Sequence, residues 1–343
     1  MSGGRRRLLV RTLFQILAIA FVVVFFFRER HLFLGFGRTM SRVVWGWLVL
    51  AFLAEMASVV PLAEAQRMVL AVAGVRAPRW RMIPVTLASN AISMSVPVGV
   101  AVAEGYTYKR YREFGAGAAV AAWGELASGA VAFAALAGIA LAGAVIDAGP
   151  AALVLVPVLS VVFAGSMGAA ILFRHPHVLV ALVEWLERHA GRGLGRVLSG
   201  WSERIREISQ GLRGVHPGIP TWAMVFGLSA ANWLLDVVSL ALAFLTVGGR
   251  VPWGAVLLAF AGTKVVSSVG ITPGGLGIVE GGLVATFVAY GSRGSVAVAA
   301  VLVYRGLTLI GLVGLGWVAA GLLAVERSRT RVPSRGAQRQ SVP

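Results

Sequence analysis

The chain of 343 residues contains no cysteine, only two lysines and few acidic side chains. The absence of cysteine excludes disulfide bonds, thiol nucleophiles and cysteine-ligated metals. Charged residues make up 13% of the chain, whereas soluble proteins carry about 25%. The sequence also has no GxxxxGK[ST], GxSxG or HExxH motif. We therefore expect no enzyme, no cofactor, no bound metal and no direct use of ATP.

Apolar residues dominate what is present. They make up 58% of the chain, and the mean hydropathy is +0.82. Apolar runs of about 20 residues recur, which is the length of a transmembrane helix. The sequence predicts an all-α, polytopic integral membrane protein with crossings near 8–27, 43–60, 116–144, 150–173, 219–247 and 295–325.

Two further regions, 82–112 and 252–290, are ambiguous. In the first, the segment that follows Pro97 is too polar to cross lipid, so a re-entrant hairpin fits better. In the second, both limbs are apolar, and either two short crossings or a broken hairpin would fit. The predicted number of transmembrane helices is therefore six to eight.

The stretch from Thr272 to Gly282 predicts a break in a membrane helix. Thr272 suits an N-cap and Pro273 the first helical position, while the glycines permit torsions that other residues resist. Irregular backbone at membrane depth is tolerated only where protein buries it or where it lines a wet cavity. A helix N-terminus also attracts anions. The break is thus a candidate site for an anionic group, with the carboxylate of Glu280 beside it.

The two ambiguous regions align with each other at an offset of 176 residues. Pro97 matches Pro273, Gly99 matches Gly275 and Glu104 matches Glu280. If the hairpins do not cross, three crossings separate the copies, and the odd number inverts the second copy. Inverted repeats with broken helices are typical of transporters with a site near the bilayer midplane. The predicted halves are 43–173 and 219–325.

Several ionisable residues interrupt the apolar runs. Such residues normally face the protein interior or a water-filled path, and they pair with one another. We expect Lys264 to form an ion pair with Asp236 or Glu280. We expect Arg305 to form an ion pair with the carboxylate of either break. A structural ion pair is an equal alternative to a substrate role for Asp236, Lys264 and Arg305, and Glu55 is expected to be structural. The candidate substrate-binding residues are Pro97, Gly99, Glu104, Asp236, Lys264, Pro273, Gly274, Gly275, Gly277, Glu280 and Arg305.

The formal net charge of +17 comes mainly from arginines between the apolar runs. Their distribution places both termini in the cytoplasm by the positive-inside rule, and membrane lipids rather than nucleic acid are the expected partners. Segment 174–217 predicts an amphipathic cytoplasmic loop, and 327–343 a disordered basic tail after a membrane domain at 1–326. The excess of arginine over lysine indicates a GC-rich bacterial genome, and hence a bacterial plasma membrane.

Three segments carry a family resemblance: Ile271-Thr272-Pro273-Gly274-Gly275-Leu276-Gly277-Ile278-Val279-Glu280, Tyr290-Gly291 and Val303-Tyr304-Arg305. Together they resemble the flippase-like membrane domain of lysylphosphatidylglycerol synthases. The similarity extends from about Arg42 to Val325, although Pro97 and Glu104 lie farther apart than in the family's common first-half pattern. In the full synthases, the membrane part moves an aminoacylated lipid that a soluble part makes. The resemblance therefore implies lipid translocation without aminoacyl transfer.

The leading hypothesis is a flippase-like protein that moves a lipid or a lipid-linked anion between leaflets. One alternative is a secondary transporter of a small soluble anion, which would need a vestibule closed to lipid. Another is a non-catalytic membrane subunit that partners a separately encoded lipid-modifying enzyme through the amphipathic loop.

Overall fold

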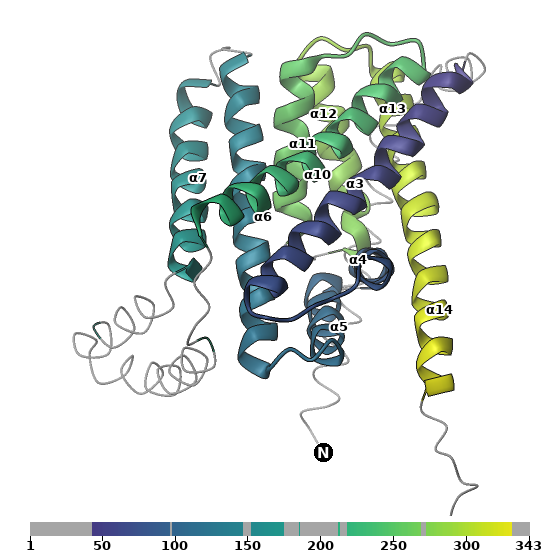
Figure 1. Ribbon diagram of the computed structural model, residues 1–343. Helices are drawn as coiled ribbons and strands as arrows, with labels where there is room; N and C mark the ends of the chain where they lie inside the picture. Colours follow the sequence, from purple (N-terminus) through teal and green to yellow (C-terminus); the bar gives the residue numbers. More distant parts are fainter. Residues whose placement is uncertain are drawn as a thin grey trace, which may run out of the picture.

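The computed structural model describes residues 43–96, 98–146, 152–174, 185, 212, 218–268 and 272–330, and within these ranges all regular structure is helical (Figure 1). The predicted all-α class is confirmed. The predicted crossing at 8–27, the loop at 174–217 and most of the basic tail lie outside the described ranges, apart from single residues of the loop. The helices are α3 (Trp45–Val72), α4 (Arg79–Ser95), α5 (Gly99–Glu113), α6 (Ala118–Ile146), α7 (Ala152–Arg174), α10 (Ile219–Thr246), α11 (Trp253–Ser268), α12 (Ile278–Ala289), α13 (Gly294–Gly306) and α14 (Val313–Thr330), with a short 3₁₀ turn η2 (Pro273–Gly275) and a π-helical turn η3 (Leu307–Leu312).

Four helical stretches of the described chain are long and apolar enough to cross a bilayer: α3, α6, α10 and the continuous run Gly294–Glu326. Each has 28 or more residues, and a helix rises about 1.5 Å per residue across a hydrocarbon core of about 30 Å. These spans agree with four of the predicted crossings, and α7 occupies a fifth. The chain is therefore a multi-pass membrane protein.

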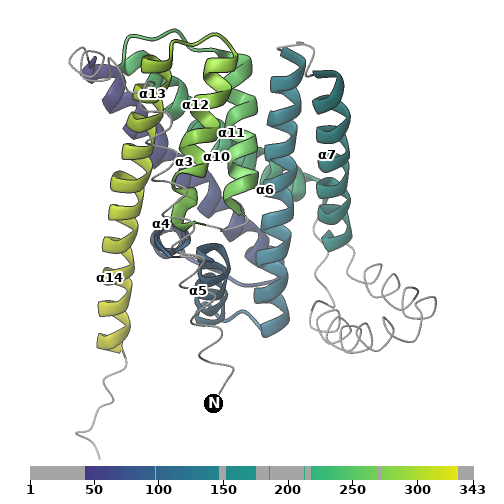
Figure 2. The ribbon, with the colours of Figure 1, turned by 180° about the vertical axis from the view of Figure 1, so that it is seen from behind.

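The two ambiguous regions form helix–break–helix hairpins. The first consists of α4 and α5, and the second of α11 and α12. Helices α11 and α12 have 16 and 12 residues, so each is shorter than the hydrocarbon core at about 1.5 Å per residue. In Figures 1 and 2 the hairpins approach from opposite ends of the bundle. Their tips touch, because a Cβ atom added to Gly274 would lie 3.0 Å from the carbonyl oxygen of Met94.

The order of elements in the first half recurs in the second half. A long helix, a hairpin and another long helical run follow one another in both. Corresponding helices start 174 or 176 residues apart: at Trp45 and Ile219, at Arg79 and Trp253, and at Ala118 and Gly294. Helices α3 and α10, the first of each half, pack side by side. These separations agree with the offset of 176 residues between the aligned proline, glycine and glutamate residues.

Each half contributes most of one hydrophobic core. The first core joins α3 to the first hairpin and α6, and includes an edge-to-face contact between Trp123 and Trp222. The second lies among α10, α11, α12 and α13, where Phe244 and Phe287 meet edge to face with ring centroids 4.8 Å apart. The two cores hold the hairpins so that their broken tips face the centre of the bundle.

The basic clusters collect at one end of the bundle. There Glu64 of α3 accepts hydrogen bonds from Arg67 and Arg79, and Arg81 of α4 forms an ion pair with Glu326 of α14. The loops at the other end carry Arg250 and Arg293. The structure thus groups Arg67, Arg79 and Arg81 at one end of the bundle.

Candidate functional site

The break in the second hairpin is present, but the following helix begins later than predicted. Gly274 and Gly277 have φ values of +58° and +83°, which favour glycine and end helical geometry. Helix α12 therefore starts at Ile278, with Gly277 as its N-cap residue. Thr272 forms no side-chain cap, contrary to the prediction, because its hydroxyl donates to the carbonyl oxygen of Leu276 at 3.1 Å.

Glu280 and Arg305 hold this break together. Glu280 Oε2 accepts a hydrogen bond from the backbone N–H of Gly277 at 2.6 Å, which caps the N-terminus of α12. Its Oε1 accepts from Arg305 Nε at 2.5 Å, and Arg305 Nη2 also donates to the carbonyl oxygen of Gly274 at 2.7 Å. The positive end of α12 is thus occupied by the protein's own carboxylate, and Arg305 supplies the compensating charge. Neutralisation of Glu280 by Arg305 is the condition under which this N-terminus could attract a substrate anion, and that attraction stays a prediction.

A second ionic group joins three helices. Asp236 of α10 accepts hydrogen bonds from Lys264 Nζ of α11 at 2.6 Å and from the phenol of Tyr304 of α13 at 2.7 Å. Of the two partners predicted for Lys264, the structure selects Asp236. The ammonium group also lies 4.9 Å from the ring centroid of Phe260 and 5.5 Å from that of Trp233, in the range of a cation–π contact.

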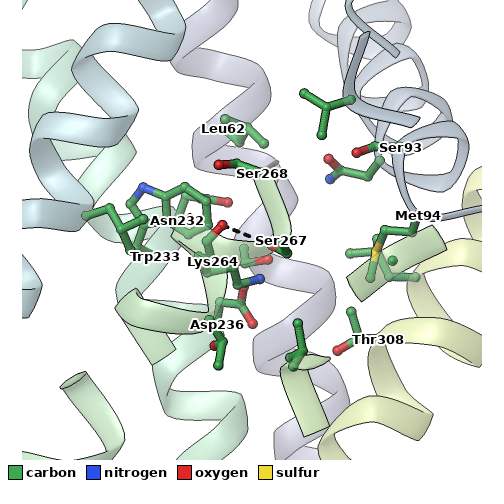
Figure 3. Close-up of a pocket in the computed structure, with 18 of the residues that line it drawn as sticks. Leu62, Ser93, Met94, Asn232, Trp233, Asp236, Lys264, Ser267, Ser268 and Thr308 are labelled. Carbon is green, nitrogen blue, oxygen red and sulfur yellow. Dashed lines mark hydrogen bonds and ion pairs between the residues drawn. The ribbon is translucent and has the colours of Figure 1, made fainter. Parts of the chain in front are cut away.

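A cavity of about 260 Å³ separates these groups from the first hairpin. Ser93 and Met94 of α4 face Asn232 and Trp233 of α10 across it, with Asp236 and Lys264 in the wall (Figure 3). The lining is rich in hydroxyl and amide groups, which come from both halves of the chain: Ser58, Asn90, Ser93, Asn232, Thr263, Ser267, Ser268, Thr272 and Thr308. The side chain of Lys264 lines the cavity and keeps 26% of its surface exposed.

The predicted residues of the first break do not all reach this cavity. Gly99 lies at the hairpin tip, where an added Cβ atom would be 2.1 Å from the carbonyl oxygen of Ser93. Glu104 is exposed and interacts with Glu125 of α6, so the structure does not bring it to Lys264 or Arg305. Pro97 lies outside the described residues. Among the side chains the structure describes, no group of three His, Asp or Glu residues could hold a metal ion.

Sequence reasoning missed several residues of the cavity wall. Tyr304 precedes Arg305 and reaches Asp236, and Asn232 lies one helical turn before Asp236 on the same face of α10. A polar residue four positions before an intramembrane aspartate was the available signal for Asn232. Glu55, expected to be structural, lines the cavity beside Asp236.

Comparisons with known proteins agree with the membrane architecture. The chain is 27% identical over 191 residues to a UPF0104 membrane protein of Methanothermobacter thermautotrophicus, and the match covers 51% of this chain and 56% of that protein. The model of the family described as "Lysylphosphatidylglycerol synthase TM region" matches residues 13–316. The chain therefore belongs to the lysylphosphatidylglycerol synthase transmembrane-region family.

Proposed function

We propose that this protein is a flippase-like translocator, which moves an anionic lipid or a lipid-linked anion between leaflets by passing its head group through the central cavity. One observation carries the proposal: a polar cavity with an accessible lysine lies where the tips of two opposed hairpins meet. Membership of the family is consistent with this function.

The main barrier to lipid exchange is the transfer of the polar head group through hydrocarbon. Polar groups lose their hydrogen bonds to water there, and each group left without a partner costs several kcal/mol. The serine, threonine and asparagine side chains of the cavity would replace those hydrogen bonds. The acyl chains would meanwhile stay in the bilayer.

Lys264 is the group that we assign to the anion. Its ammonium is held by one carboxylate, Asp236, and by two aromatic faces, and its side chain is 26% exposed. Arg305 is less available, because Glu280 and the Gly274 carbonyl occupy its donors and only 7% of its side chain is exposed. A phosphate group would compete with Asp236 for Lys264 and release that carboxylate.

The internal repeat supports alternating access to this cavity. We propose that the two halves are inverted copies, since their elements recur in the same order and their hairpins approach from opposite ends. We also propose that the end carrying the Arg67, Arg79 and Arg81 cluster faces the cytoplasm, with both termini on that side and the protein in a bacterial plasma membrane.

The test is a leaflet-resolved assay in proteoliposomes. The purified full chain is reconstituted in phosphatidylcholine vesicles that contain a trace of phosphatidylglycerol with a fluorescent acyl chain, and a membrane-impermeant quencher reports the outer-leaflet fraction. We expect quenching of the inner-leaflet pool to proceed faster than in protein-free vesicles. Fluorescent phosphatidylcholine is the matched probe without net charge, and it should move more slowly.

Two outcomes would contradict the proposal. Equal rates with and without protein would remove the translocator function. Uptake of radiolabelled inorganic phosphate or acetate without movement of the lipid probe would favour the alternative of a small-anion carrier.

A further inference from the structure

Glu55 of α3 is a carboxyl group without an evident structural role. It is 2% exposed, and it forms part of the cavity wall. Its Oε2 atom has no hydrogen-bond partner among the described residues. A buried carboxyl group with an unpartnered oxygen at the edge of a polar cavity calls for an explanation, and a small ligand in the cavity would supply the missing hydrogen bond.

The hydrogen bonds around Asp236 indicate what that ligand is. Asp236 accepts one bond from the Lys264 ammonium at 2.6 Å and another from the Tyr304 phenol at 2.7 Å, so Asp236 holds the negative charge. Glu55 lines the same cavity as Asp236, and among the described residues no cation is bonded to its carboxyl group. Because an ionised carboxylate buried without a bonded cation is costly, a proton on Glu55 is the ligand that fits this position.

The other charged groups near Glu55 are already engaged. Lys264 of α11 compensates Asp236, and Arg305 of α13 is bound to Glu280. Tyr304 donates to Asp236. The described residues of α4, α6 and η3, which also pack against α3, bring no further charged side chain to Glu55. The group Glu55, Asp236 and Lys264 is therefore neutral only with one bound proton.

We propose that Glu55 and Asp236 form a proton-binding site that couples proton movement to passage of the anion through the cavity. When a head-group anion binds Lys264, Asp236 loses its ammonium partner. The O–H bond of Glu55 then breaks, an O–H bond forms on Asp236, and hydronium in the cavity restores the proton on Glu55. One proton thus enters with each negative charge, and the loaded cavity stays neutral.

This inference rests on the proposed translocation for its coupling, but the proton site itself can be tested separately. The infrared spectrum of the purified full chain at neutral pH should contain the carbonyl stretching band of a protonated carboxylic acid. Glu55→Gln should reduce that band, whereas Glu113→Gln, at the exposed end of α5, should not. A band of equal intensity in the native and Glu55→Gln proteins would overturn the proposal. If Glu55→Gln fails to fold, Glu55→Asp is measured instead, and it should shift the band. An unshifted band would overturn the proposal.

The coupling is tested in the proteoliposomes with an imposed pH difference and no membrane potential. Transport of one proton with one negative charge lets a difference of one pH unit accumulate the phosphatidylglycerol probe about tenfold in the leaflet facing the alkaline side. Glu55→Gln should leave the probe equally distributed. The coupling is overturned if the native protein moves the probe but leaves it equally distributed between the leaflets despite the pH difference. Absence of any movement with the infrared band present would instead reject the proposed function and retain the proton site.

Discussion

Arg305 and Glu280 connect α13 to the break of the second hairpin, with Arg305 Nε and Glu280 Oε1 2.5 Å apart and both side chains buried. The same guanidinium also holds the Gly274 carbonyl. Because the two residues are 25 positions apart and on different helices, this pair fixes the hairpin tip to the long helical run that follows it.

Removal of this cation should destabilise the protein strongly. Arg305→Met leaves the Glu280 carboxylate buried and uncompensated, which costs roughly 3–5 kcal/mol. The measurement is the thermal unfolding midpoint in detergent, and Arg305→Met with Glu280→Gln should recover part of the loss. The control is Arg110→Met, whose pair with Glu113 is partly exposed and should contribute less than about 1 kcal/mol. An Arg305→Met midpoint equal to that of Arg110→Met would contradict the role of Arg305.

Lys264→Met should slow lipid movement. The variant keeps a side chain of similar length between Phe260 and Trp233 but loses the cation that meets the head group. We expect at least a roughly tenfold lower rate, which corresponds to about 1.4 kcal/mol. The chain provides a matched control in its other lysine, because Lys109 is exposed on α5 and Lys109→Met should leave the rate unchanged. Equal rates for both variants would exclude Lys264 from the path.

Gly99→Ala should disturb the first hairpin. Its Cβ atom would lie 2.1 Å from the carbonyl oxygen of Ser93, and backbone cannot yield to that contact without moving the tip. We expect a loss of roughly 1–3 kcal/mol, as for other overpacking substitutions. Gly105→Ala in the same helix meets no atom within 4 Å, and it should stabilise α5 by about 0.5–1 kcal/mol. Melting curves that shift in the same direction would contradict this account of the tip.

Val98 is the one non-glycine residue of the described chain with positive φ, at +56°. A β-branched residue in this left-handed conformation is strained by roughly 1–2 kcal/mol. Val98→Gly should therefore raise the unfolding midpoint, since glycine adopts the conformation without that cost. Val102→Gly, an exposed position inside α5, should lower it. If both variants lower the midpoint, the strain at Val98 is not relieved by glycine.

The sequence was sufficient to predict the class of protein and the locations of its breaks. Long apolar runs fix the crossings, because hydrocarbon leaves few other ways to satisfy the backbone. The proline and glycine pattern located the second interruption, and the polar return of 98–112 identified the first hairpin. The alignment of Pro97 with Pro273 also agrees with the order of helices, which is the same in the two halves. The inversion of these copies stays a prediction.

The ionic partners could not be derived in the same way. Asp236, Lys264, Glu280 and Arg305 are spread over four helices, and the choice of pairs depends on how those helices pack. The start of α12 was placed five residues early, since Pro273 satisfies the rule for a first helical position although Gly274 and Gly277 interrupt the helix after it. Placing the start at Ile278 would have put Glu280 at the third helical position, where a carboxylate caps the helix.

Passage of a head group requires water to reach the cavity at membrane depth, and the absence of native cysteine makes this testable by single-cysteine labelling. Ser267→Cys places a thiol in the cavity wall, and Ile310→Cys places one on an outer surface that is 80% exposed. In sealed proteoliposomes, we predict that a membrane-impermeant thiol reagent modifies Ser267→Cys, and that added phosphatidylglycerol slows the reaction. Ile310→Cys should stay unmodified, because hydrocarbon keeps its thiol protonated and excludes the reagent. Equal resistance of both thiols would contradict a head-group passage at this site.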